Sequence, residues 1–125
     1  MIKPTETELE ILNILWKEGP SSVRKVNEKM NEQKEVGYTT TLKLMQIMSQ
    51  KGLVSRDESS RTHIYLPEVQ AKDIQGQLVD KLLHTAFGGS ASELVLSALG
   101  SGKASAKELE EIKALIDKLE RDEQH

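Results

Sequence analysis

Four polar side chains between residues 39 and 46 are the ones best suited to recognition chemistry in this sequence. They would share one face of a helix, because side chains three or four residues apart lie on the same side. Lysine can donate to guanine acceptors, glutamine can pair with adenine, and threonine methyl groups can touch thymine methyl groups. The four are Thr39, Thr40, Lys43 and Gln46. The pattern predicts base reading in the major groove of DNA; an ordinary solvated helix face is the alternative.

Residue types that would support an enzyme or a metal site are sparse. The chain has no cysteine, which removes disulfides, thiolate ligands and cysteine nucleophiles together. The histidines His63, His84 and His125 lie far apart, and no pair has helical ligand spacing. The sequence offers neither a phosphate-binding loop nor a nucleophile with a nearby base. We therefore expect no metal, no cofactor and no enzymatic activity.

The charge distribution first argues against a nucleic-acid partner, because the net charge is −3. The two halves differ, however. Residues 1–67 carry ten Lys and Arg against nine Asp and Glu, a net charge of +1, whereas residues 68–125 carry seven against eleven, a net charge of −4. Local charge governs phosphate binding, so the first half is the better candidate for a DNA surface. Because this excess of positive charge is small, a second possibility stays open: the first half is a module for protein–protein contact without DNA affinity.

The apolar stretches are too short to suggest a membrane segment. None approaches the roughly 20 residues that span a bilayer. The N-terminal residues lack the apolar core of a signal peptide. We therefore expect no direct membrane insertion, and the cytoplasm is the expected compartment.

Three helices and a hairpin are predicted to position the polar face. A capping box at Thr5–Glu8 begins the first helix, and Gly19–Pro20 ends it. A second helix follows, and the third runs from near Thr39 to Lys51–Gly52. This order, followed by a hairpin, predicts a winged helix-turn-helix domain of three helices and a two- or three-stranded wing over residues 1–68.

The hairpin itself is predicted from a change of periodicity after the third helix. Short strands at Leu53–Arg56 and Thr62–Leu66 enclose a polar tip. Arg61 is expected to contact phosphate, with His63 nearby, because most protein–DNA hydrogen bonds go to the backbone. The alternative is a surface hairpin with ordinary solvated arginines.

The remaining residues, 69–125, are predicted to form a helical dimerisation domain. A second capping box at Ser105–Glu108 begins the last helix, in which apolar residues repeat at 3-4-3 spacing, as in a coiled coil. The small winged domain cannot bury all these apolar stripes, so we expect a homodimer reading an inverted repeat, with an intramolecular helical subdomain as the alternative. The residues expected at the dimer contact are Ile74, Leu78, Leu82, Leu94, Leu109, Ile112, Ile116 and Leu119.

Four ordered stretches resemble the penicillinase-repressor family, the BlaI/MecI/CopY group of bacterial regulators. The stretches are residues 5–16, residues 37–54 with Gly37-Tyr38-Thr39-Thr40-Thr41 at their start, residues 61–67, and Phe87–Ser90 followed by Leu94–Leu96. The resemblance implies a mostly α-helical winged-helix repressor that binds a palindromic operator as a homodimer. It also adds Tyr38 and Leu42 to the DNA-binding residues, Leu42 standing where some β-lactam-responsive members have arginine.

The resemblance further implies a route to release. In antibiotic-responsive members, a membrane sensor-protease pathway ends with cleavage of the repressor in its C-terminal domain. Carried over, the cut would fall at Ser97–Ala98, where members typically have Asn-Phe. Copper-responsive members carry a cysteine cluster near the C-terminus. This chain has no cysteine, which excludes copper sensing by that route.

Overall fold

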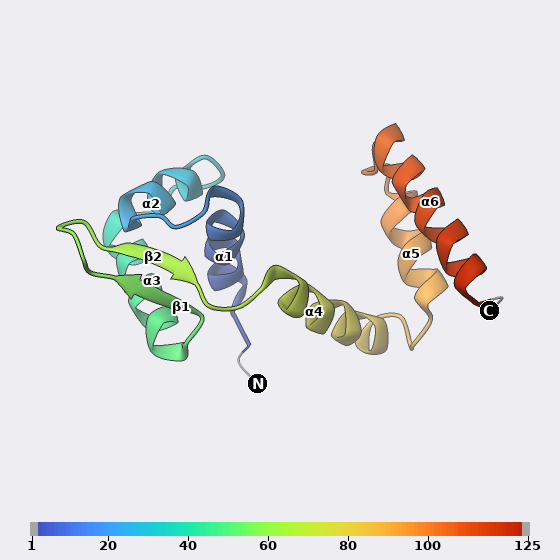
Figure 1. The fold of residues 1–125 in the computed structure, drawn as a ribbon, viewed down its shortest axis with the longest axis horizontal. Helices are drawn as coiled ribbons and strands as arrows, with labels where there is room; N and C mark the ends of the chain where they lie inside the picture. Colours follow the sequence, from blue (N-terminus) through green and yellow to red (C-terminus); the bar gives the residue numbers. More distant parts are fainter. Residues whose placement is uncertain (1–2, 124–125) are drawn as a thin grey trace. The chain divides into compact units, whose positions relative to one another are not determined.

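The computed structural model describes residues 3–123, which form six helices and one antiparallel pair of strands (Figure 1). The elements are α1 (Glu6–Glu18), α2 (Val23–Asn31), α3 (Tyr38–Lys51), β1 (Val54–Asp57), β2 (Ile64–Pro67), α4 (Ala71–Thr85), α5 (Ala91–Gly100) and α6 (Ala106–Glu123). The chain divides into two compact units, Met1–Gln77 and Leu78–His125. Their border falls inside α4, whereas the boundary predicted from the sequence lies between residues 68 and 69.

Both predicted capping boxes begin helices. At the start of α1, the Glu8 N–H donates to Thr5 Oγ1 at 3.2 Å, and the Thr5 N–H donates to Glu8 Oε1 at 2.9 Å. At the start of α6, Ser105 and Glu108 make the same two bonds at 3.1 Å. Each box satisfies two N–H groups that a helix start leaves without a backbone acceptor.

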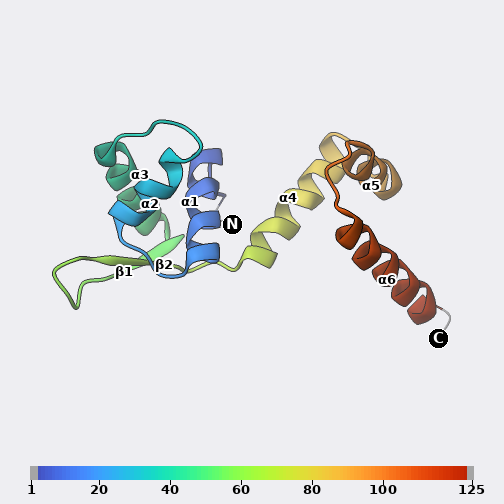
Figure 2. The same cartoon turned by 90° about the horizontal axis from the view of Figure 1, so that it is seen from above.

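The core of the first unit is mainly aliphatic, since the sequence holds only one tryptophan, two tyrosines and one phenylalanine. It fills the space between α1, α2, α3 and the hairpin, and Figures 1 and 2 show these elements packed side by side. The fully enclosed apolar side chains are Ile11, Leu12, Leu15, Val26, Met45, Met48, Leu53, Val54 and Tyr65. The two methionines of α3, Met45 and Met48, are three residues apart and both belong to this core.

The hairpin forms a two-stranded sheet with Arg56 opposite Tyr65 and Val54 opposite Pro67. Tyr65 is buried and also bridges to Ser21 in the loop before α2, through N–H to carbonyl bonds of 2.8 and 3.1 Å. The expected two- or three-stranded wing is therefore two strands plus one bridge. Both strands begin and end a residue or two later than the sequence predicts, and the tip projects beyond the three helices (Figure 2).

Trp16 and Ile74 tie the beginning of α4 to the first unit. The indole N–H of Trp16 donates to the Val69 carbonyl at 2.9 Å, and Trp16 packs against the core. Ile74 is only 3% exposed. The structure therefore corrects our expectation that Ile74 lies at the dimer contact. Its own chain buries Ile74 and leaves it no free surface for a second copy.

The second unit buries little apolar surface. In α5 and α6, no residue that the structure describes is buried. Large apolar side chains that stay exposed in this unit are Val79, Leu82, Val95, Leu96, Leu109, Leu115, Ile116 and Leu119. Leu78, Leu94 and Ile112 are half-buried. Within residues 3–123, we find no helix of the length and hydropathy needed to cross a membrane.

Candidate nucleic-acid interface

One face of α3 packs into the core and the opposite face is open to solvent. Thr41, Met45 and Met48 are buried, which fixes the rotation of the helix about its own axis. The side chains predicted to read bases therefore point outward. The exposed set comprises Tyr38, Thr39, Thr40, Lys43 and Gln46.

A groove of about 440 Å³ lies between α3, the start of α2 and the hairpin. It brings together predicted residues that are far apart in the sequence: Tyr38, Leu42 and Gln46 from α3 with Arg61 and His63 from the hairpin tip. The other lining residues are Ser22, Val23, Arg24, Arg56, Thr62 and Tyr65. Three arginines and a histidine line the groove without an acidic residue among its described lining, so the local potential favours an anion.

The remaining predicted readers lie outside this groove. Thr39, Thr40 and Lys43 are exposed on α3 but do not line it. Leu42 is half-buried and packs against the core, so it presents only part of its side chain to the groove. The predicted residues of α3 therefore share one helix face, and the groove, with Arg61 and His63 in its lining, lies along one side of that face.

The structure adds Arg24 to the candidate interface, a residue that the sequence analysis did not select. Arg24 lies in the first turn of α2, two residues after the N-cap Ser22, whose side chain accepts from the Lys25 N–H at 3.2 Å. The signal was available, because a helix start next to a recognition helix suits phosphate binding. Arg56 also lines the groove, but it forms an ion pair with Glu58.

Two asparagines of α2 hold the beginning of α3. Asn27 Nδ2 donates to Thr41 Oγ1 at 2.9 Å and to the Val36 carbonyl at 3.0 Å. Asn31 exchanges two bonds with the backbone of Val36, at 2.9 and 3.1 Å. Since Thr41 is buried, its hydroxyl needs a partner inside the protein. The turn between the helices is thus fixed by side chains whose roles no local sequence pattern indicates.

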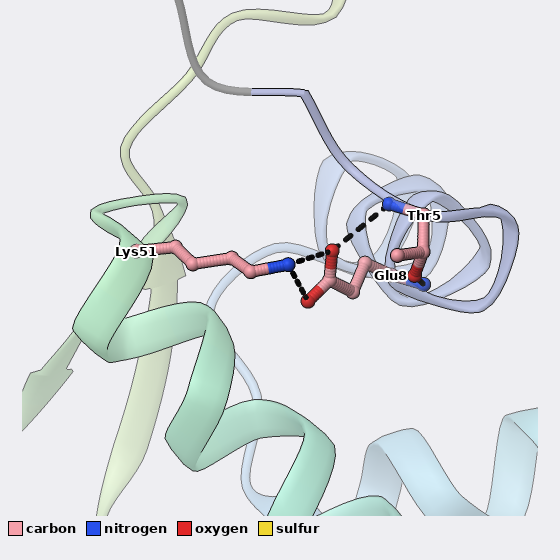
Figure 3. A network of polar contacts seen from close by, with 3 residues as sticks. All are labelled: Thr5, Glu8 and Lys51. Atoms are coloured by element: carbon pink, nitrogen blue, oxygen red, sulfur yellow. Dashed lines mark hydrogen bonds and ion pairs between the residues drawn. The ribbon is translucent and has the colours of Figure 1, made fainter.

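The end of α3 is held by an ion pair with α1. Lys51 Nζ donates to both carboxylate oxygens of Glu8, at 2.9 and 3.0 Å, while Glu8 also accepts from the Thr5 N–H (Figure 3). Glu8 is 2% exposed. Burial by itself raises the pKa of Glu8, but the Thr5 N–H and the Lys51 ammonium outweigh it and bring the pKa below its usual value. Glu8 is therefore a buried, charged carboxylate.

Three helices, a two-stranded hairpin and a basic groove define a winged helix-turn-helix protein. A family model described as Penicillinase repressor matches residues 4–118, and the chain belongs to this family. The match confirms the resemblance inferred from the four sequence stretches. The family consists of transcriptional regulators, which confirms the prediction that the chain is not an enzyme.

Individual relatives are distant in sequence. The Penicillinase repressor of Staphylococcus aureus is 23% identical over 114 residues, which cover 91% of this chain and 90% of the relative. The Methicillin resistance regulatory protein MecI of Staphylococcus aureus strain N315 is 24% identical, with 91% and 93% covered. The Transcriptional regulator BlaI of Mycobacterium tuberculosis strain H37Rv is 31% identical over 88 residues, which cover 68% of this chain and 63% of the relative.

A solved structure supports the fold. BlaI of Bacillus licheniformis, in its monomeric form and in complex with the blaP half-operator, superposes with a TM-score of 0.51 at 18% identity. The match covers 58% of this chain and 88% of that chain. The predicted fold class, a mostly α-helical winged-helix protein with a helical C-terminal region, is confirmed.

Proposed function

We propose that this chain is a transcriptional repressor that binds an inverted-repeat DNA site as a homodimer. The observation that carries the proposal is the groove in which cationic side chains from α2 and the hairpin lie beside the polar face of α3. A DNA duplex needs both parts, because phosphate contacts position the protein and base contacts supply specificity.

Each part of the interface has a role in this proposal. Thr39, Thr40, Lys43 and Gln46 read base edges in the major groove. Arg24 and Arg61, which line the groove beside α3, contact phosphates. The helix start supports this arrangement, because Gly37 provides no side-chain cap and the first N–H groups of α3 can meet a phosphate.

The relatives support the same reading. Proteins that share most of this chain's length carry names of repressors and regulators, and the BlaI structure contains a half-operator. A half-operator is what one subunit of a dimer would recognise. Two such half-sites would be separated by about one helical turn of DNA, 10–10.5 bp, or a multiple of it.

The exposed apolar side chains of the second unit support the homodimer. Leu109, Leu115, Ile116 and Leu119 lie along α6 and are 40–55% exposed. Contiguous apolar surface of this kind marks an interaction site. We assign it to a second copy, which would place two recognition helices on one DNA site.

The proposal includes release by proteolysis at Ser97–Ala98. Both residues are exposed, which gives access to a protease, but both lie inside α5. A protease acting there would first have to unwind that helix. A membrane sensor-protease pathway is the partner that the family resemblance implies.

Selection from a pool of random double-stranded DNA tests the proposal with the full chain. We expect the enriched sequences to contain an inverted repeat, and a gel shift with the enriched duplex to show a complex that weakens as salt rises. Failure to enrich any sequence, with binding no tighter than to random duplex, would reject the repressor. It would favour the alternative, a winged helix used for protein–protein contact.

A further inference from the structure

The recognition helix α3 is attached by side chains at both of its ends. At its beginning, Asn27 of α2 bonds Thr41, and at its end Lys51 bonds Glu8 of α1 (Figure 3). The 14 residues of α3 span about 21 Å at 1.5 Å per residue. The buried Thr41, Met45 and Met48 hold one face of α3 against the core, and the two side-chain attachments add a constraint on the direction of the helix axis.

Helix capping alone does not explain the burial of Glu8. The chain contains a second capping box at Ser105–Glu108 with the same two hydrogen bonds, and there Glu108 is exposed. Local capping therefore requires no burial and no lysine. What distinguishes Glu8 is the contact with Lys51, 43 residues away in the sequence.

Stability alone is also a poor reason for this ion pair. Removing a carboxylate from water is costly, and well-packed apolar residues often serve a core equally well. An ion pair does provide direction, since both carboxylate oxygens and the ammonium must meet at hydrogen-bond distance. Base reading needs such a constraint, because N–H donors and oxygen acceptors bond only between about 2.7 and 3.2 Å.

We propose that Glu8 and Lys51 are positioning residues for DNA recognition, which hold α3 at the tilt that its outer side chains need to read bases. This inference rests on the proposed DNA-binding function. Neither residue needs to touch DNA: Glu8 acts through Lys51, and Lys51 acts through the direction of α3.

Glu8→Gln gives a test in which charge and position predict opposite results. The substitution removes a negative charge, which by electrostatics alone strengthens binding to DNA. Positioning predicts the reverse: about tenfold weaker binding to the selected duplex, with binding to random duplex unchanged or slightly stronger. Glu10→Gln is the matched control, because it removes the same charge from the same helix and breaks only an exposed pair with Lys34 at 3.4 Å.

Lys51→Met tests the pair from its other side, and Lys34→Met is its control for the lost positive charge. Lys51 is 38% exposed, so a methionine fits there, and the variant removes the pair without a substitution at the buried Glu8. Lys51→Arg retains the charge and the donors, and we expect it to restore discrimination to within threefold of the parent.

The readout is the ratio of the dissociation constants for random and selected duplex. It is measured at a temperature where circular dichroism shows each variant fully folded, because a residue that only stabilised the fold would leave the ratio unchanged there. A ratio within twofold of the parent for Glu8→Gln and Lys51→Met would overturn the inference. Failure of the parent chain to select any duplex would instead reject the proposed function itself.

Discussion

In the proposed DNA interface, single side chains have one of two roles, reading a base or contacting a phosphate. Lys43 lies on the outer face of α3, whereas Arg61 lies in the hairpin tip beside the groove. We expect Lys43→Ala to weaken binding to the selected duplex by about 1–3 kcal/mol and to relax the sequence preference at one position. We expect Arg61→Ala to weaken binding to all duplexes about equally and to reduce the salt slope by about 1.

Titration of binding against salt separates these two outcomes, with Lys118→Ala of α6 as a control for loss of one positive charge. Equal losses from Lys43→Ala on selected and random duplex would show that Lys43 contacts only phosphate. An unchanged salt slope after Arg61→Ala would remove Arg61 from the set of phosphate contacts.

Glu8 also makes the stability of the first unit depend on pH. Because the folded protein holds the pKa of Glu8 below its usual value of 4.5, the unfolded chain takes up the proton first as the pH falls. The stabilisation is therefore complete above about pH 4.5 and is lost as the pH falls through the lower, folded value. We expect Glu8→Gln to cost about 1–3 kcal/mol at pH 7 and progressively less below pH 4.5.

Urea unfolding of the parent and of Glu8→Gln at several pH values between 7 and 3 measures this difference. Glu108→Gln serves as the control, because it alters the exposed capping box and leaves the ion pair intact. A difference that stayed constant across that range would show that the Glu8 charge contributes nothing.

Among the elements, helix ends are the features that the sequence predicts best. Capping boxes and Gly52 lie within a few residues of the helix ends that they determine. For this reason α1 and α6 begin where expected, and α3 ends where expected. The strands are displaced slightly, because pairing between them, rather than local preference, decides their ends. Asn27 with Thr41 and Glu8 with Lys51 are contacts between helices, and no spacing rule along one segment reveals them. Arg24 differs from these pairs, because its place in the first turn of α2 was a signal that the sequence offered.

Gly52 is the element-scale feature with the clearest energetic consequence. It ends α3 in the left-handed region, at φ 82°, and its N–H donates to carbonyls of the last turn. We expect Gly52→Ala to lower the free energy of unfolding by about 1–2 kcal/mol, because an L-residue pays that much in this conformation. Gly76→Ala, inside α4 with open space around it, should instead raise stability by about 0.5–1 kcal/mol.

Thermal unfolding followed by circular dichroism distinguishes the two glycines. Equal effects of both substitutions would contradict the conformational explanation, since the amino-acid change is the same. Because Gly76 lies in α4 and Gly52 at the end of α3, the two variants also show whether stability gained in α4 is independent of the recognition helix.

At the scale of the whole molecule, the exposed apolar side chains of α6 are the feature that bears on the proposed homodimer. Ile116 lies on α6 with 47% of its surface exposed, next to Leu115 and one turn from Leu119. We expect Ile116→Asp to weaken self-association by at least about 100-fold, because burying such a side chain is worth about 1.5–3 kcal/mol in each of two copies. Lys118→Gln changes the charge equally and should leave association unaffected.

Sedimentation equilibrium over a range of micromolar concentrations measures this association. A parent chain that stays monomeric throughout would reject the dimer. A dimer that survives Ile116→Asp would place the contact elsewhere than this face of α6.

Trp16 gives the molecule a built-in optical probe. It is the only tryptophan in the sequence, and its indole N–H is bonded to the Val69 carbonyl just before α4. Its fluorescence therefore reports on one place, the attachment of that helix to the winged unit. An emission maximum that moves to longer wavelength would signal that water has replaced the carbonyl, without any label being attached. Stopped-flow mixing with DNA could thus follow this junction in real time in the unmodified chain.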